Sequence, residues 1–423
     1  MQTETPPKRG ERLLTILLMG LIAVSGGFGA FILAHNTSSP QSPLGGIDVN
    51  LHVTVRNQTG QIIPQDTRNV NGDLVLNNFN NFLAGLFNPT GASVTGGGNL
   101  APGAGSGSGS GTNCDSGSNP SASFFWGASN CIDSSESIGY NSNTVTCTTT
   151  SPCGGMVEIG TSSTAPTRSD TGVTTLYGSE TLTSSSTCST GTTDSVDFSG
   201  TVSITSTATI TEAAGGINTA YGYASGGATT GVGFQYFNFF HDTFTGISVA
   251  SGDSVDVSYS VSLGTAGFNV NLCNFLAGLF SPVTNQNGVA VSLKDTAGTA
   301  TDFYIWTNQG SSANCILSTS ASGCSSPSAA SFIAIGTGTT TYTPTTYALG
   351  TQVASATMGT ISYVSGTTST IYYPGTFTTA SGDSITEGAI GLTLSSNNYL
   401  FFGSTFTAQS AGNPFGISAE ISD

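Results

Sequence analysis

The residues best suited to acid–base chemistry are His241 and Asp242, which are adjacent in the sequence. In many hydrolases a histidine acts as the general base and a carboxylate orients it. Here both residues lie in an alternating Phe-Phe-His-Asp-Thr-Phe-Thr segment that predicts a β-strand, and neighbouring strand residues point to opposite faces. The two side chains are therefore not expected to form a dyad, and we interpret His241 as a structural residue at the edge of a sandwich.

Two glutamates, Glu212 and Glu387, each follow an Ile-Thr dipeptide. Glycoside hydrolysis needs two carboxylates that face each other across one bond. These two occupy equivalent places in two copies of a repeated sequence, so we predict a structural role at a strand end. Nucleophile-elbow, P-loop and calcium-loop patterns are absent from the sequence. We therefore expect no enzymatic activity and no cofactor.

The cysteines lie beyond the apolar N-terminal segment, where an oxidising compartment would make disulfides the default. Alignment of the repeat matches Cys131 with Cys315, and Cys147 or Cys153 with Cys324. We predict a Cys315–Cys324 bridge in the second copy and either Cys131–Cys147 or Cys131–Cys153 in the first.

Two further cysteines have other expected roles. Cys114 would take the remaining loop partner, and Cys273, next to a predicted buried helix, would be a free core thiol. A zinc site needs Cys or His at ligand spacing. The histidines (His35, His52 and His241) are scattered and there is no Cys-x-x-Cys, so we predict no metal site.

The candidate residues described above lie within an internal sequence repeat, whose fold is expected to position them. The heptapeptide Asn-Phe-Leu-Ala-Gly-Leu-Phe at 81–87 recurs at 274–280. Shorter blocks recur in the same order, and their offset only decreases along the chain: 130–132 and 314–316, 159–161 and 335–337, 210–212 and 385–387, and 239–245 and 401–407. This pattern is typical of a duplicated domain. It predicts domain 1 at residues 47–264, here called copy 1, and domain 2 at 265–423, here called copy 2.

The local patterns within each copy favour strands. Residues 51–56, 196–212 and 367–379 alternate polar and apolar side chains, as half-buried strands do. The repeated heptapeptide predicts a short amphipathic helix, and the Gly-Ser-rich segment 96–111 predicts a flexible loop. The expected fold is mainly β: two tandem antiparallel β-sandwich (jelly-roll-like) domains, each with one short helix, after an N-terminal hydrophobic helix.

Copy 1 begins with a strand that copy 2 has no room for. An open sandwich edge invites a strand from another chain, which makes Leu51, Val53 and Val55 candidate strand-donor residues. The alternatives are that the strand at 255–263 is shared between the copies, or that a linker covers the edge.

The N-terminus indicates the compartment. A basic segment at 1–12 precedes an uncharged apolar run at 13–34, which is long enough to cross a bilayer, and residues 35–46 form a linker. The run is either a cleaved signal peptide or a retained membrane anchor. A third interpretation takes Lys8-Arg9-Gly10 as a prepilin-type processing site. All three place the remainder outside the cytoplasm, at the cell surface or beyond it, where Asn36 and Asn57 begin glycosylation sequons.

Charge is scarce. Only 7 % of the 423 residues are charged, and the formal net charge is −16. A nucleic-acid binder needs clustered Lys and Arg, so this class of function is excluded. Ser, Thr and Gly instead fill the polar positions, which leaves few lysines to protect strand edges.

Copy 2 contains an aliphatic-Gly-Thr-Gly-Thr-Thr run at 332–340, then Thr-Pro-Thr at 343–345, Ala-Leu-Gly-Thr at 348–351 and Ile-Thr-Glu-Gly at 385–388. This order resembles phage and archaeal-virus tail or fibre-type structural proteins, and copy 1 matches it more loosely. The N-terminal segment looks more like that of secreted archaeal surface proteins and filament subunits, some of which join by donated strands.

The resemblance implies a non-catalytic extracellular structural protein, a subunit of a filament or surface layer that contacts copies of itself through β-strands. Residues 13–34 would add a membrane contact if they are not cleaved. One alternative is a virion structural protein of an archaeal virus or provirus. The other is a glycan-binding adhesin that uses Tyr221, Tyr223 and Tyr347.

Overall fold

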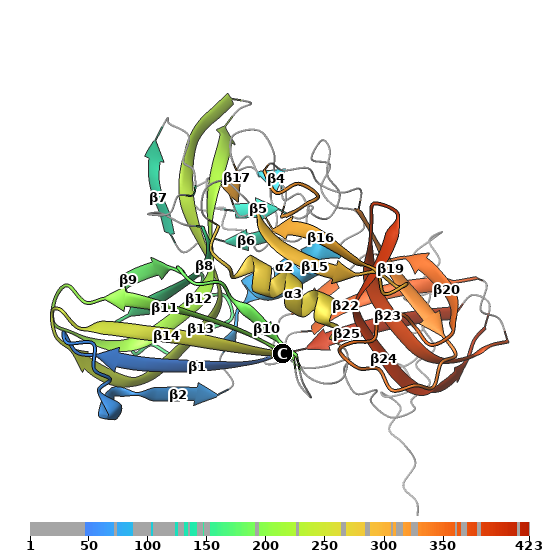
Figure 1. The fold of residues 1–423 in the computed structure, drawn as a ribbon, viewed down its shortest axis with the longest axis horizontal. Helices are drawn as coiled ribbons and strands as arrows, with labels where there is room; N and C mark the ends of the chain where they lie inside the picture. The colour runs from blue at the N-terminus through green and yellow to red at the C-terminus, as the bar shows by residue number, and fades with distance from the viewer. Residues whose placement is uncertain are drawn as a thin grey trace, which may run out of the picture. The chain divides into compact units, whose positions relative to one another are not determined.

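The computed structural model shows a mainly β protein with several antiparallel sheets, which confirms the predicted fold class at this level (Figure 1). It describes residues 47–71, 74–87, 103–104, 123–125, 131–133, 136–141, 147, 153–190, 194–225, 228–263, 268–283, 288–305, 308–309, 316–322, 329–359, 362–364, 370–378, 382–412 and 415–422.

Copy 1 contributes one α-helix and most of the strands. Its elements are β1 (Ile47–Arg56), the 3₁₀ helix η1 (Pro64–Asp66), β2 (Arg68–Asn71), β3 (Leu74–Val75), α2 (Asn77–Leu86), β4 (Gly103–Ala104), β5 (Ser123–Phe125), β6 (Cys131–Asp133), β7 (Glu136–Asn141), β8 (Gly154–Gly160), β9 (Leu176–Thr181), β10 (Thr187–Ser189), β11 (Asp194–Ser203), β12 (Ala208–Ser225), β13 (Ala228–Val249) and β14 (Ser254–Leu263).

Copy 2 contributes the second α-helix. Its elements are α3 (Val270–Leu279), β15 (Val289–Lys294), β16 (Ala300–Ile305), β17 (Asn308–Gln309), β18 (Leu317–Ser318), β19 (Ala329–Gly336), β20 (Gln352–Thr357), β21 (Ser362–Val364), β22 (Thr370–Phe377), β23 (Ser384–Leu394), β24 (Asn397–Ser410) and β25 (Phe415–Ser422).

Two sheets of copy 1 carry its long strands. One has the order β10-β11-β14-β1-β2, and the other contains β3-β13-β12-β8-β9 with β7 and β17 attached. The alternation in β1 and β14 explains the first sheet, because every second residue is apolar and buried while its neighbours are polar. The two strands pair over their full length, from Ile47 opposite Leu263 to Arg56 opposite Ser254.

The strand pairing of copy 2 repeats that of copy 1. The sheet β20-β19-β23-β24 corresponds to β9-β8-β12-β13, and β21-β22-β25 corresponds to β10-β11-β14. The registers agree residue by residue: Met156 lies opposite Thr181, and Phe332, 176 positions further on, lies opposite Thr357. The bulge before Glu212 in β12 recurs before Glu387 in β23. The duplicated sequence therefore adopts a duplicated backbone.

The repeated heptapeptide forms most of the two helices, α2 and α3. Nearly every residue of each is buried, and in α2 this includes three of its four asparagines. Phe82 of α2 and Phe275 of α3, at the same position in the heptapeptide, have ring centroids 6.3 Å apart. Equivalent residues that meet each other imply a local two-fold relationship between the helices.

The end of each helix packs into the other copy. Phe87 contacts the rings of Tyr373, Phe401 and Phe402 in copy 2, with centroids 5.2–5.8 Å apart. The core is therefore continuous from copy 1 into copy 2.

The reciprocal contact is present as well. Phe280, the counterpart of Phe87, contacts Phe198, Phe239 and Phe240 of copy 1, with centroids 4.4–6.3 Å apart. Each of these three rings is the counterpart of one that Phe87 contacts.

The disulfides correct two predictions. Cys188 of β10 is bonded to Cys273 of α3, so Cys273 is not a free thiol. The prediction was wrong because α3, which begins copy 2, packs against β10 of copy 1, and repeat alignment does not reveal such a contact. The two cysteines belong to different copies and lie 85 positions apart.

The second bridge joins Cys147 to Cys153, six positions apart with Cα atoms 5.4 Å apart. The predicted pairing of Cys131 with either residue is therefore wrong, because the two are bonded to each other within one short loop. The side chains of the other disulfide candidates, Cys114, Cys131, Cys315 and Cys324, lie outside the described residues.

The candidate strand-donor residues of β1 pair within their own chain in this structure, and donation of the strand to another chain stays a prediction. Leu51, Val53 and Val55 are at most 1 % exposed, and β1 lies between β14 and β2 of its own chain. Their apolar side chains complete the core of copy 1, so pairing within the chain satisfies both the backbone and the buried face.

The predicted N-terminal segments 1–12, 13–34 and 35–46, with Asn36, lie outside the described residues, as does the loop 96–111 apart from β4. Within the described ranges, no helix is long and apolar enough to cross a membrane. Asn57 is described: its Oδ1 accepts from Thr59 N and Gln61 N in the turn after β1.

Candidate functional site

Glu387 of β23 is a buried carboxylate held by backbone amides. It is 3 % exposed. Its Oε1 accepts from Gly338 N at 2.8 Å and Thr351 N at 2.9 Å, and its Oε2 accepts from Gly350 N at 2.9 Å. Three N–H donors compensate the charge that burial would otherwise penalise. The carboxylate therefore fastens both ends of the loop between β19 and β20.

Glu212 of β12 makes the same contacts in copy 1. Its Oε1 accepts from Ser162 N and Thr175 N, both at 2.9 Å, and its Oε2 accepts from Thr174 N at 2.8 Å. Each donor is the counterpart, 176 positions earlier, of a donor to Glu387. We call these two arrangements the glutamate clusters. The geometry agrees with the structural role predicted for both residues.

A glycine makes room for each carboxylate. A Cβ atom at Gly160 would lie 2.4 Å from Glu212 Oε1 and 2.6 Å from the Thr175 carbonyl oxygen. At Gly336 the corresponding distances are 2.4 Å to Glu387 Oε1 and 2.5 Å to the Thr351 carbonyl oxygen. A Cβ atom does not lie this close to a neighbouring atom, so only glycine fits at these two positions. The repeated Ile-Gly-Thr and Ile-Thr-Glu motifs are therefore two parts of one cluster.

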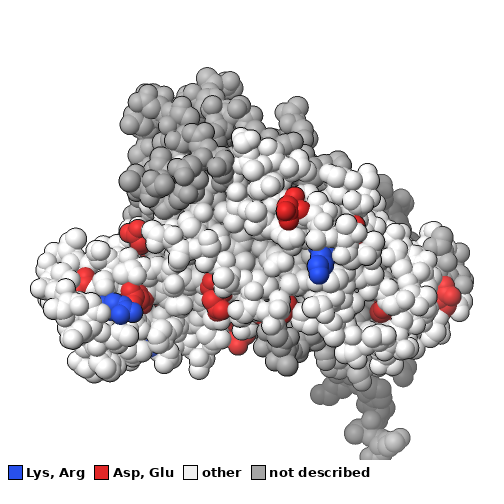
Figure 2. Space-filling view, viewed as in Figure 1, with Lys and Arg blue, Asp and Glu red and all other residues white. Residues whose placement is uncertain are grey.

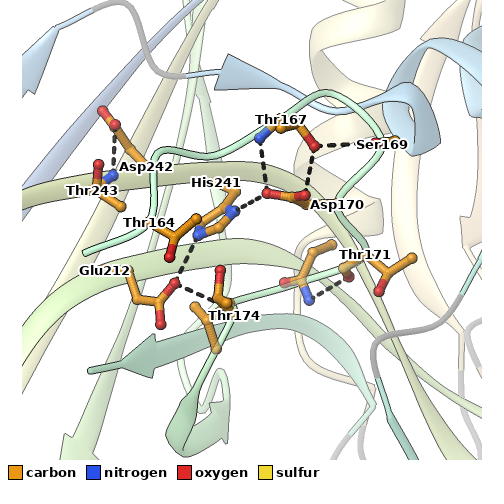
Figure 3. A network of polar contacts seen from close by, with 12 residues as sticks. Thr164, Thr167, Ser169, Asp170, Thr171, Thr174, Glu212, His241, Asp242 and Thr243 are labelled. Atoms are coloured by element: carbon orange, nitrogen blue, oxygen red, sulfur yellow. Dashed lines mark hydrogen bonds and ion pairs between the residues drawn. The ribbon is translucent and has the colours of Figure 1, made fainter. Parts of the chain in front are cut away.

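Copy 1 adds a histidine to its cluster (Figure 3). His241 Nε2 lies 3.1 Å from Glu212 Oε2, and His241 Nδ1 lies 3.0 Å from Asp170 Oδ2. Asp170 also accepts from Thr167 N and Thr167 Oγ1. The ring thereby joins the 161–175 loop to β12 and β13.

The structure corrects the placement of His241 at a sandwich edge. The side chain is fully buried, and its strand pairs with β12 on one side and β3 on the other. Asp242 does point away from it and accepts from Thr243 N, as the strand geometry predicts (Figure 3). The sequence pattern missed Asp170, which lies 71 positions from His241, because only the folded loop brings it close.

An aromatic ring fills the corresponding space in copy 2. Gly403 stands at the position of His241, and a Cβ atom there would lie 2.3 Å from the ring of Tyr342. Tyr342 is buried, and this burial raises the pKa of its phenol; a hydrogen bond with Asn269 opposes the shift. The position beside the strand thus holds a histidine that contacts the glutamate in copy 1, and a glycine packed against a tyrosine ring in copy 2.

The glutamate cluster of copy 1 has few polar atoms that a substrate could reach. Both nitrogens of His241 and both oxygens of Glu212 are occupied by protein groups. A general base has to reach a substrate proton within hydrogen-bond distance, and this side chain has no exposed surface. Among the residues that the structure describes, no group of three or more Cys, His, Asp or Glu has a geometry that could hold a metal ion.

The visible surface has little charge. Figure 2 shows scattered Asp, Glu, Lys and Arg side chains among the described residues of one face, with one basic side chain against an acidic one. Of the adhesin candidates, the half-buried Tyr347 has Lys294 Nζ 5.0 Å above its ring centroid. The side chains of Tyr221 and Tyr223 lie outside the described residues.

The copies differ most at β14 and its counterpart β25. β14 pairs with β11 on one edge and β1 on the other. β25 pairs with β22, and no described strand pairs with its second edge. Only residues 264–267 separate β14 from the segment that leads into α3, which leaves no length for a counterpart of β1.

Comparison with known proteins gave no match: no family model, no curated protein and no solved structure is similar to this chain.

Proposed function

We propose that the chain is a non-catalytic extracellular structural protein built from two tandem β-sandwich domains. It serves as a subunit of a filament or surface layer, of the archaeal type, and assembles with copies of itself through β-strand contacts. The N-terminal apolar segment 13–34 directs it across the membrane or anchors it there.

The second edge of β25, with which none of the described strands pairs, is the observation that carries this proposal. In the duplicate, the same edge is covered by the ten residues of β1. Unpaired backbone N–H and C=O groups on a long edge strand favour pairing with another chain. Natural proteins block such edges with Lys, Pro or bulges, but β25 has the sequence Phe-Gly-Ile-Ser-Ala-Glu-Ile-Ser with only one charged residue.

Other features support an extracellular, non-catalytic role. The described disulfides are consistent with an oxidising compartment. The most suggestive polar network, around His241, is completely occupied by protein contacts. The polar positions of β14 and β25 are Ser and Gly apart from Asp256 and Glu420, so each strand has one charged residue that could repel a partner.

Light scattering on the full-length chain in detergent, over a range of protein concentrations, tests the proposal. We expect species larger than one chain, with a fraction that increases with concentration. A chain that stays monomeric at every concentration would contradict self-assembly, whichever strand is involved.

A further inference from the structure

We propose that β25 pairs antiparallel with β25 of a second copy, about a two-fold axis at Ser418. This pairing rests on the proposed self-assembly and names the contact that achieves it. The described chain has one β1 strand but two equivalent strand edges at which such a strand could pair, one on β14 and one on β25. Because β1 occupies its own sheet, the edge of β25 needs a different partner.

The backbone of β25 presents hydrogen-bonding groups to its open edge. Ser418 lies opposite Pro374 of β22. The carbonyl oxygen of Pro374 accepts from Gly359 N, on the side away from β25. Since N–H and C=O of one strand residue point to the same side, this is a non-hydrogen-bonded pair, and Ser418 directs both groups to the open edge.

The counterpart of Ser418 shows what fits there. Ser258 of β14 lies opposite Ser199 of β11 and opposite His52 of β1. β1 is an antiparallel strand with alternating apolar residues, so the partner of β25 should have the same character. Val257 is fully buried with both neighbours present, whereas its counterpart Ile417 is half-buried.

β25 itself has the required pattern. Its apolar positions alternate with Gly, Ser and Glu, as in β14. Residues directly opposite each other in an antiparallel pair share a face, so apolar residues of one copy must lie opposite apolar residues of the other. This holds when the numbers of two opposed residues add up to an even number. Centring the axis on Ser418 places Phe415 opposite Ile421 and Ile417 opposite Ala419. Glu420 then lies opposite Gly416, which keeps the only charged residues apart.

The two-fold arrangement uses both open edges at once. Each Ser418 would donate its N–H to the carbonyl oxygen of the other, so neither strand retains a free edge. Such an isologous contact closes after two copies, and a filament or layer then needs a second contact elsewhere. The outer edges of β9 and β20, unpaired among the described strands of both copies, are available for it.

Disulfide trapping tests this contact. In a hydrogen-bonded antiparallel pair the opposed Cα atoms lie about 5.5 Å apart, which suits a disulfide. Full-length chain with Ser418→Cys, oxidised at a concentration where the wild type self-associates, should give covalent dimers. Peptide mass spectrometry should place the link between the two introduced thiols, one from each chain. Ser258→Cys, at the counterpart that is covered on both edges, should give no such dimer.

Two outcomes would overturn the pairing. Self-association without a link between the two introduced thiols would show that assembly uses another contact, so the proposed function would stand and this inference would fail. A link that forms only in a mixture of Ser418→Cys and His52→Cys chains would show instead that β25 takes β1 of the second copy. Circular dichroism of each variant, compared with the wild type, shows whether the chain is folded.

Discussion

Phe82 and Phe275 pack against each other at 6.3 Å and occupy the same position of a repeated heptapeptide. The two copies therefore meet through equivalent residues, in the way that two subunits of a symmetric dimer meet. Each helix is built into the core of both copies, because Phe87 and Phe280 extend into opposite halves.

Truncation of Phe87 or Phe280 should destabilise the whole chain and not one copy. Both side chains are fully buried, and Phe→Ala in a core costs about 3–5 kcal/mol. Chemical denaturation followed by fluorescence and circular dichroism should show one coincident transition for each variant. Ile62→Ala, at a side chain that is 50 % exposed, should change the free energy of unfolding by less than about 0.5 kcal/mol. Separate transitions for the two copies would contradict a shared core.

Replacement of either repeated glutamate by glutamine should be costly. Glu387→Gln places an amide group among three backbone donors, so at least one N–H loses its acceptor; we expect a loss of about 3 kcal/mol. Glu212→Gln should cost at least as much, because His241 also loses its partner. The free energy of unfolding measures both. The exposed Glu180→Gln is the matched control, and equal values for all three variants would disprove the role of the clusters.

The glycines beside the carboxylates should not tolerate a methyl group. Gly336→Ala and Gly160→Ala would each bring a Cβ atom against a backbone carbonyl oxygen as well as the glutamate, and we expect losses of about 2 kcal/mol or more. Thermal unfolding is the readout. In Gly388→Ala the new methyl group would meet neighbours at 3.4 Å or beyond, so its melting temperature should stay close to that of the wild type. Similar melting temperatures for all three variants would be inconsistent with the described packing.

Tyr373 should make the protein sensitive to alkali. The side chain is fully buried, its hydroxyl has no hydrogen-bond partner among the described residues, and burial raises its pKa far above the ordinary value. A raised pKa in the folded state gives stability that is complete below the unfolded pKa of about 10 and decreases as pH rises above it.

Tyr373→Phe should therefore reduce the loss of stability by about 1.4 kcal/mol per pH unit above about pH 10. At neutral pH it should be neutral or stabilising by about 1 kcal/mol, because an unsatisfied hydroxyl is removed. Urea unfolding at a series of pH values measures both effects. Tyr347→Phe, at a half-buried ring, controls for the loss of a hydroxyl. An unchanged alkaline slope would contradict the burial of Tyr373.

Some of this architecture could be predicted from the sequence. The heptapeptide indicated both helices, and alternation indicated strands such as β14, because local periodicity reflects which face is buried. The spacing between Ile-Gly-Thr and Ile-Thr-Glu differs by only one position between the two copies, which was a signal that these motifs act together. It was not decisive, because spacing alone does not show that Glu212 and Glu387 bind backbone amides.

The rest depends on contacts between distant segments. His241 meets Asp170 only because the 161–175 loop folds back over β13, and Cys273 meets Cys188 only because α3 packs on the other copy. The repeat alignment compared equivalent positions, whereas these contacts join positions that are not equivalent. The missing counterpart of β1 was visible in the sequence, whereas the pairing of β1 with both β14 and β2 of its own chain was not.

The most direct test of assembly through β25 is sedimentation velocity of the full-length Ser418→Pro chain beside Ser418→Ala. Proline at 418 removes an N–H that faces the open edge and leaves the ladder to β22 intact, so the fold should persist. We predict that Ser418→Ala self-associates like the wild type, whereas Ser418→Pro loses the β25 contact and sediments as smaller species than the wild type, with an unchanged circular dichroism spectrum. A folded Ser418→Pro chain that self-associates like the wild type would contradict the account.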